Sequence, residues 1–151
     1  MTPVEQTKYG LHAGNCLTAC VASLLDVPIT AVPEFCVDGE WFTRLDEFCR
    51  ENGFFLIYWR HSEALPIVCL NVYVILLLAL EGTEDLHAVV AKTYVSDRIP
   101  VTDKEIESGA ALAEDAGGVR WAWGSEIVHD PNTRGYPPIR EVRGYILIGK
   151  Q

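Results

Sequence analysis

The sequence is poor in basic residues. Twelve Lys and Arg stand against 21 Asp and Glu, which gives a formal net charge of −9 at pH 7 over 151 residues. A protein that binds nucleic acid needs a basic face to neutralise phosphates. The balance therefore argues against DNA or RNA as a partner, and an acidic surface is more often a solubility feature than a binding feature.

The chain also lacks a disulfide framework and a targeting segment. Its five cysteines are odd in number and spread over a chain of one ordinary domain, which is not typical of a disulfide-rich secreted protein. The first ten residues, MTPVEQTKYG, contain no basic region followed by an apolar run, as a signal peptide would. We expect a protein of the reducing cytoplasm.

A long transmembrane run is absent as well. The most apolar stretch is residues 67–80 (IVCLNVYVILLLAL), which is shorter than the roughly 20 residues that a helix needs to cross a bilayer. The stretch is rich in β-branched residues and contains Asn71. It predicts one buried central strand, or two strands in succession, and no membrane association.

Two helices are predicted in the first third of the chain. Apolar residues recur at helical spacing from residue 17 to 25, and Pro28 ends the pattern. A second helix is predicted over residues 40–52, where Gly53 stands at the position of a C-terminal glycine cap.

The rest of the chain predicts mainly strands, at residues 54–59, 72–80, 87–95, 125–129 and 145–148. A capping box, Thr102-Asp103-Lys104-Glu105, predicts one further short helix that runs toward Ala116. No repeat or linker divides the chain. We expect a single α+β domain over residues 1–151, with helices packed on an antiparallel sheet and an insertion at about residues 96–124.

Cys16 is the candidate nucleophile, because it follows Gly14-Asn15 at the start of the first helix. A helix N-terminus and a neighbouring imidazolium both favour the thiolate, so we expect a lowered pKa at this thiol. The structural alternative is a buried, inert cysteine. Cys20, Cys36, Cys49 and Cys69 are predicted to be packing residues.

A cysteine nucleophile needs a base, and the base needs a partner that fixes its tautomer. His87 opens an apolar strand and Asp130 ends the next predicted one, so the carboxylate reaches the imidazole if these strands are neighbours. Gln6 lies on a segment expected to pass beside the helix start. Its amide and the backbone N–H of Cys16 are candidate donors for an oxyanion hole.

Other assignments of these residue types are weaker. His129 is a rival base, but strand alternation turns it away from Asp130, and His12 lies in a glycine-flanked loop without an orienting partner. A zinc site built from Cys16, Cys20, His87 and His129 lacks the usual ligand spacing. We expect neither a metal nor a cofactor.

The motifs resemble those of a known superfamily. Gln6, Gly14-Asn15-Cys16, His87-Ala88-Val89-Val90 and Val128-His129-Asp130-Pro131 occur in the order found in small papain-like proteins of phage genomes. More distantly, the chain is similar to the peptidase domains that process bacteriocin leader peptides. This resemblance implies a papain-like fold with an N-terminal catalytic helix, with Cys16 as nucleophile, His87 as base, Asp130 as orienting acid and Gln6 as oxyanion donor.

The same resemblance implies a thiol peptidase or isopeptidase that works through a thioester and takes a peptide or protein as substrate. Two alternatives stay open. One is acyl transfer or deamidation on the same triad. The other is a catalytically inactive papain-like protein that binds a host component. The oligomeric state is left open by the sequence.

Overall fold

The structure is a computed structural model. It describes residues 1–10, 14–37, 39–60, 72–96, 112–114, 120–135 and 137–150. Residues 94–96, 112–114 and 120–124 are described by their backbone, and the other described residues with their side chains as well.

Two α-helices and one short 3₁₀ helix form the N-terminal part: α1 (Cys16–Leu25), η1 (Ile29–Ala31) and α2 (Trp41–Glu51). Helix α1 ends at Leu25 and is capped by Asp26, which adopts a left-handed conformation with φ 56° and donates its backbone N–H to the carbonyls of Ala22 and Ser23. Helix α2 is followed by Gly53 with φ 75°, a conformation that glycine adopts without a steric penalty. Both predicted helices are therefore confirmed, within one or two residues at each end.

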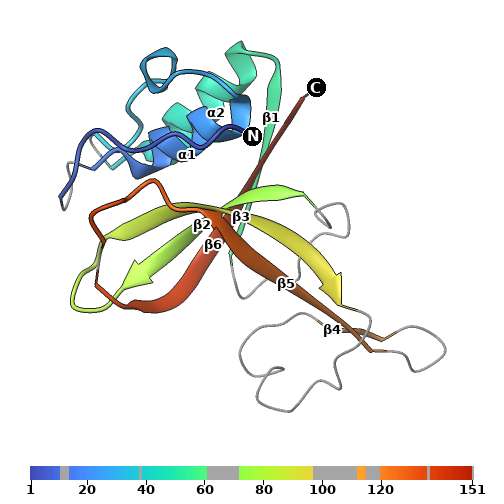
Figure 1. The fold of residues 1–151 in the computed structure, drawn as a ribbon. Coiled ribbons are helices and arrows are strands. Elements are labelled where there is room, and N and C mark those ends of the chain that lie inside the picture. Colours follow the sequence, from blue (N-terminus) through green and yellow to red (C-terminus); the bar gives the residue numbers. More distant parts are fainter. Residues whose placement is uncertain are drawn as a thin grey trace.

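The rest of the described chain forms one six-stranded sheet with the order β1-β6-β2-β3-β5-β4. All neighbouring strands pair antiparallel. The strands are β1 (Phe54–Arg60), β2 (Tyr73–Leu80), β3 (Leu86–Ser96), β4 (Leu112–Glu114), β5 (Arg120–His129) and β6 (Ile139–Lys150). Figure 1 shows the helices on one side of the sheet, and α1 packs mainly on β3 while α2 packs on β1. The predicted α+β class with an antiparallel sheet is confirmed.

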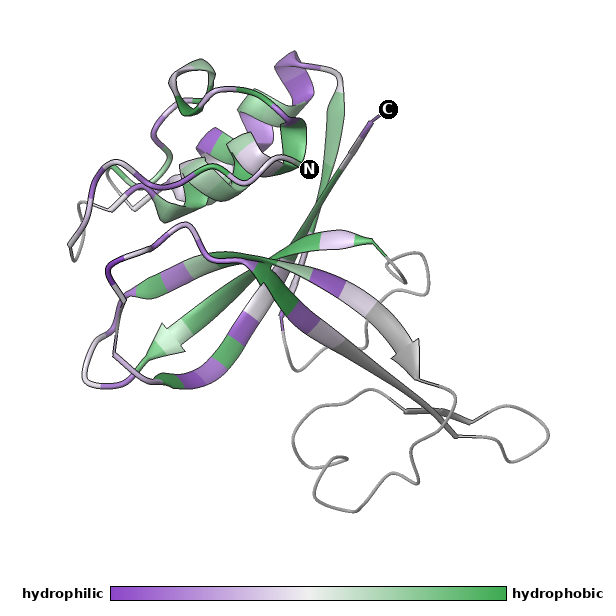
Figure 2. Cartoon of the chain, in the orientation of Figure 1, coloured by the Kyte–Doolittle hydropathy of each residue, from purple (hydrophilic) through white to green (hydrophobic). Residues whose placement is uncertain are grey.

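Strand β2 accounts for the described part of the apolar stretch, whose residues 67–71 lie outside the described residues. Ile75 and Leu77 belong to the core cluster that includes α1 and α2, whereas Val74, Leu76 and Leu78 belong to a second cluster with Trp59 and Tyr145. Because both sets are buried, the strand needs apolar residues at every position instead of at alternate ones. Figure 2 shows this continuous hydrophobic strand beneath the apolar residues of α1.

The segment between β3 and β5 differs from its prediction. Leu112–Glu114 form strand β4, which pairs with Arg120, Trp121 and Ala122 of β5. The helix expected over this part of the chain is therefore wrong at residues 112–114, because pairing with β5 satisfies this backbone and overrides its helix propensity. The Trp121–Trp123 segment, expected in the insertion, belongs to β5. The capping box at residues 102–105 lies outside the described residues.

Within the described part of the chain, no helix combines the length and the apolar character needed to cross a membrane.

We expect Leu45→Ala to lower the free energy of unfolding by about 2–5 kcal/mol, since a leucine that is 0% exposed leaves a cavity when truncated. Leu45 packs in the cluster that joins α2 to α1 and the sheet. Urea denaturation followed by circular dichroism measures the change. Glu47→Ala on the exposed face of the same helix is the control and should stay within about 0.5 kcal/mol of wild type. Equal effects of both substitutions would contradict this packing of α2.

Candidate active site

Cys16 lies at the first residue of α1 and is half-buried. It lines a cavity of about 720 Å³ together with Gln6 and His87. The sulfur also lies against the backbone of Ala88, the residue after His87. Two parts of the chain that are about 70 residues apart in sequence thus meet at this cavity.

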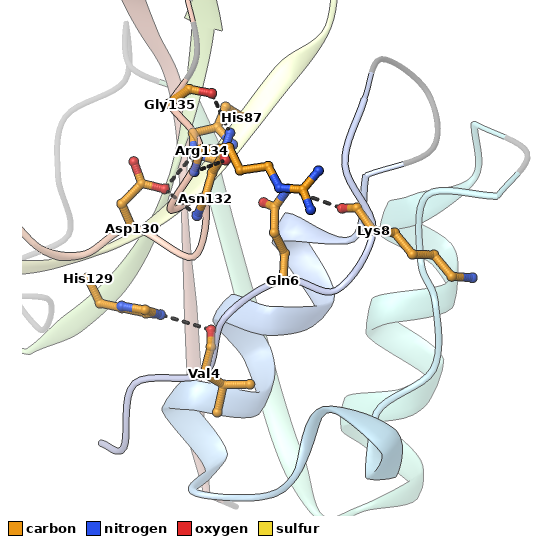
Figure 3. Close-up of polar contacts among 9 residues, drawn as sticks. All are labelled: Val4, Gln6, Lys8, His87, His129, Asp130, Asn132, Arg134 and Gly135. Carbon is orange, nitrogen blue, oxygen red and sulfur yellow. Dashed lines mark hydrogen bonds and ion pairs between the residues drawn. The ribbon is translucent and has the colours of Figure 1, made fainter.

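His87 and Asp130 form a direct contact. Nε2 of His87 lies 2.9 Å from Oδ1 of Asp130 (Figure 3). Strand β5 pairs with β3 and ends at His129, opposite Val90, so Asp130 leaves the sheet next to the His87 end of β3. His87 is 5% exposed and the Asp130 side chain 27%. The contact predicted between these two side chains is confirmed.

The Asp130 carboxylate is held by the loop that follows it. The same Oδ1 accepts the backbone N–H of Asn132 at 2.8 Å. The Asn132 side chain in turn accepts the backbone N–H of Arg134 and donates to the carbonyl of Gly135, both at 3.0 Å. Asn132 is a positioning residue that was not predicted from the sequence, although an Asn directly after an Asp-Pro pair is a common turn signal.

Gln6 lies at the same cavity and is 5% exposed. Its backbone N–H donates to the carbonyl of Pro131 at 3.0 Å, which joins the N-terminal segment to the end of β5. One N–H of its side-chain amide donates to the carbonyl of Lys8 at 3.1 Å. The amide nitrogen carries a second N–H, while Oε1 is buried without a hydrogen-bond partner in the described part of the structure.

Asn15 fixes the N-terminal segment to the start of α1. Its Oδ1 accepts the backbone N–H groups of Thr7 and Lys8, and its Nδ2 donates to Oγ1 of Thr7, all at 3.0 Å. Its backbone N–H donates to the carbonyl of Lys8 at 3.2 Å. The residue before Cys16 therefore positions the residues after Gln6. Sequence alone gave no sign of this role, because the backbone groups that Asn15 binds lie seven and eight residues before it.

The protonation state of Cys16 differs from the expectation. Burial raises the pKa of the Cys16 thiol above its ordinary value, and the negative charge of Asp130 acts in the same direction. The backbone N–H groups of Ala88, Leu17 and Cys16 itself favour the thiolate and lower the pKa, but by less than burial raises it. The expected low pKa is therefore wrong for this arrangement, and the resting cysteine is a neutral thiol at pH 7.

The remaining described histidine and cysteines differ in their positions relative to the cavity. Nε2 of His129 contacts the carbonyl oxygen of Val4 at 2.9 Å. Cys20 and Cys49 are buried as predicted, whereas Cys36 is exposed in a turn and lines the cavity, so its prediction as a packing residue is wrong. His12 and Cys69 are not among the described residues. No group of three or more metal-binding side chains occurs in the described ranges.

Comparisons with known proteins found no relative: no family model matches the chain, and no curated protein or solved structure matches it.

We expect Asn15→Ala to lower the free energy of unfolding by about 1–3 kcal/mol, because the backbone N–H groups of Thr7 and Lys8 lose their acceptor. Thermal and urea denaturation measure the loss. Asn52→Ala is the matched control, since its side chain makes one exposed hydrogen bond to Phe48, and it should cost less than about 1 kcal/mol. If both substitutions had the same small effect, the hydrogen bonds of Asn15 to Thr7 and Lys8 would not contribute to stability.

We expect alkylation of Cys16 by iodoacetamide to be slow at pH 6 and to rise up to alkaline pH. Only the thiolate reacts, and a pKa raised by burial moves its formation to higher pH. Mass spectrometry of the Cys36→Ser variant after short labelling at several pH values reports Cys16 without its exposed neighbour. Complete, rapid labelling of Cys16 at pH 6 would contradict the neutral resting thiol.

Proposed function

We propose that this protein is a papain-like cysteine hydrolase that cleaves peptide or isopeptide bonds through a thioester intermediate. The observation that carries the proposal is the contact of His87 with Asp130 at a cavity that Cys16 and Gln6 also line. A thiol, an imidazole with a carboxylate on its other side, and an amide donor are the groups that this chemistry requires.

The proposed first step is a proton transfer. Nε2–H of His87 donates to Asp130, which leaves the lone pair on Nδ1. As Sγ of Cys16 attacks the substrate carbonyl, Nδ1 takes the thiol proton. Since the resting thiol is neutral, this transfer accompanies substrate binding and attack instead of preceding them. Asp130 stabilises the imidazolium that forms.

The negative charge on the carbonyl oxygen then needs hydrogen-bond donors. The backbone N–H of Cys16 lies at the helix N-terminus, and the second N–H of the Gln6 amide is the proposed partner. The imidazolium gives its proton to the leaving amine, and the thioester remains on Cys16. Water attacks the thioester with His87 again as base, which releases a carboxylic acid and restores the thiol.

One observation favours a second candidate, a papain-like protein that binds its partner without chemistry. Burial raises the pKa of the Cys16 thiol, which an enzyme with a preformed thiolate would avoid. The same cavity then serves as a binding site for a peptide or protein. The two candidates differ in whether an acyl group is accepted by Cys16 and later released.

p-Nitrophenyl acetate separates them, because it acylates a reactive thiol without a known substrate. We expect wild type to form an acetyl thioester on Cys16 and to hydrolyse it, as shown by nitrophenolate release and by mass spectrometry. Asp130→Asn should slow turnover by roughly 10⁴-fold, by analogy with the serine triad, because the wrong tautomer of His87 is favoured. The fold should be retained, because Asn at position 130 also has an Oδ1 that accepts the backbone N–H of Asn132.

Two variants serve as controls for this experiment. Cys16→Ala should abolish the thioester, and Glu126→Gln on the exposed part of β5 should leave turnover at the wild-type rate. Unchanged turnover in Asp130→Asn would reduce the site to a Cys–His pair. A stable acetyl group that is never released, or no acylation at all, would favour the binding protein.

A further inference from the structure

The cavity beside Cys16 has an acidic wall. Glu84 and Asp85 line it from the turn between β2 and β3, directly before the strand that carries His87. Glu84 is exposed and Asp85 half-buried. Among the described residues, no Lys or Arg lines the cavity. A cleft lined by one sign of charge concentrates ligands of the opposite sign.

Two cations lie near Gln6 (Figure 3), but both are engaged and neither lines the cavity. Lys8 forms an ion pair with Glu34. The guanidinium carbon of Arg134 lies 3.9 Å from the ring centroid of Tyr9, in a cation–π contact. The two cations are therefore engaged outside the cavity, by Glu34 and by Tyr9, and Glu84 and Asp85 are the carboxylates that line it among the described residues.

Gln6 provides an independent sign of a ligand. Its side chain is more than nine-tenths buried and lines this cavity, and its Oε1 has no hydrogen-bond partner in the described structure. A buried acceptor without a donor costs about 1–3 kcal/mol, and native proteins leave few of them. A ligand that brings an N–H group into the cavity satisfies this oxygen.

The other walls suit a peptide with a long side chain. The cavity of about 720 Å³ is in the usual range for ligand sites. Leu17, Val37 and Trp41 are apolar residues of the lining, and the methylene stem of a Lys or Arg side chain packs on such surfaces while its charged end stays in a polar environment.

We propose that the cavity selects peptide or protein segments with a Lys or Arg next to the bond that Cys16 attacks. The basic group binds at Glu84 and Asp85, and an N–H group of the segment donates to Oε1 of Gln6. The position of the cleaved bond rests on the proposed function, whereas the charge preference of the cavity does not.

The charge preference is measured at Cys16 itself with two thiol reagents, cationic 2-aminoethyl methanethiosulfonate and anionic 2-sulfonatoethyl methanethiosulfonate. Both form a mixed disulfide with the cysteine and release methanesulfinate, so they report local charge without any turnover. The measured quantity is the ratio of the rate of the cationic reagent to that of the anionic reagent. In the Cys36→Ser background at pH 9, we expect this ratio to be about tenfold or more higher at Cys16 than at the thiol of glutathione. High salt should weaken the preference.

The double variant Glu84→Gln/Asp85→Asn should bring the ratio of the two rates back to the glutathione value. Glu81→Gln is the control: it removes one negative charge from the same turn region, at a residue that does not line the cavity, and should keep most of the preference. Taking the ratio cancels any change in the pKa of Cys16, because both reagents need the thiolate. Circular dichroism verifies that each variant is folded.

Three results would overturn the proposal: a wild-type ratio equal to that of glutathione, a ratio that the double variant leaves unchanged, or a Cys16 that neither reagent reaches. A cationic preference without turnover of p-nitrophenyl acetate would support the acidic binding site and contradict the proposed hydrolase activity.

Discussion

The antiparallel pairing of β3 with β5 is the constraint on which the candidate site depends. Residues 87 and 130 are separated by a long stretch of sequence, and their contact exists because β5 returns along β3 and ends at His129. The segment between them adds β4 at the far side of β5. Extra residues between β3 and β5 are therefore compatible with the contact, because loop length changes the closure entropy only slowly.

A second constraint acts on the other half of the site. The N-terminal segment has no secondary structure of its own up to residue 10, yet it is fixed at several points. Oγ of Ser23 accepts the backbone N–H of Val4 at 2.9 Å, Pro131 accepts that of Gln6, and Asn15 accepts those of Thr7 and Lys8. These bonds replace the strand or helix that would otherwise position Gln6, and they connect it to α1 and to the end of β5.

Burial has two opposing effects at this site. It strengthens the contact between His87 and Asp130, because hydrogen bonds to a charged group are stronger where water is excluded. It also raises the pKa of Cys16, because a thiolate is poorly solvated there. A mechanism in which His87 removes the thiol proton during attack is compatible with both effects, whereas a preformed thiolate is not.

The sequence alone determined the two helices, the strands of the core and the α+β class, because each follows from local periodicity and end signals such as Pro28 and Gly53. It also identified Cys16, His87, Asp130 and Gln6 as residues that belong together. It could not determine β4, where pairing with β5 overrides local propensity, or the exposure of Cys36. The hydrogen bonds of Asn15 to the N-terminal segment and the raised pKa of Cys16 were likewise decided by tertiary structure. Hydrogen-bond partners and desolvation depend on which distant segments surround a residue, and local sequence does not contain that information.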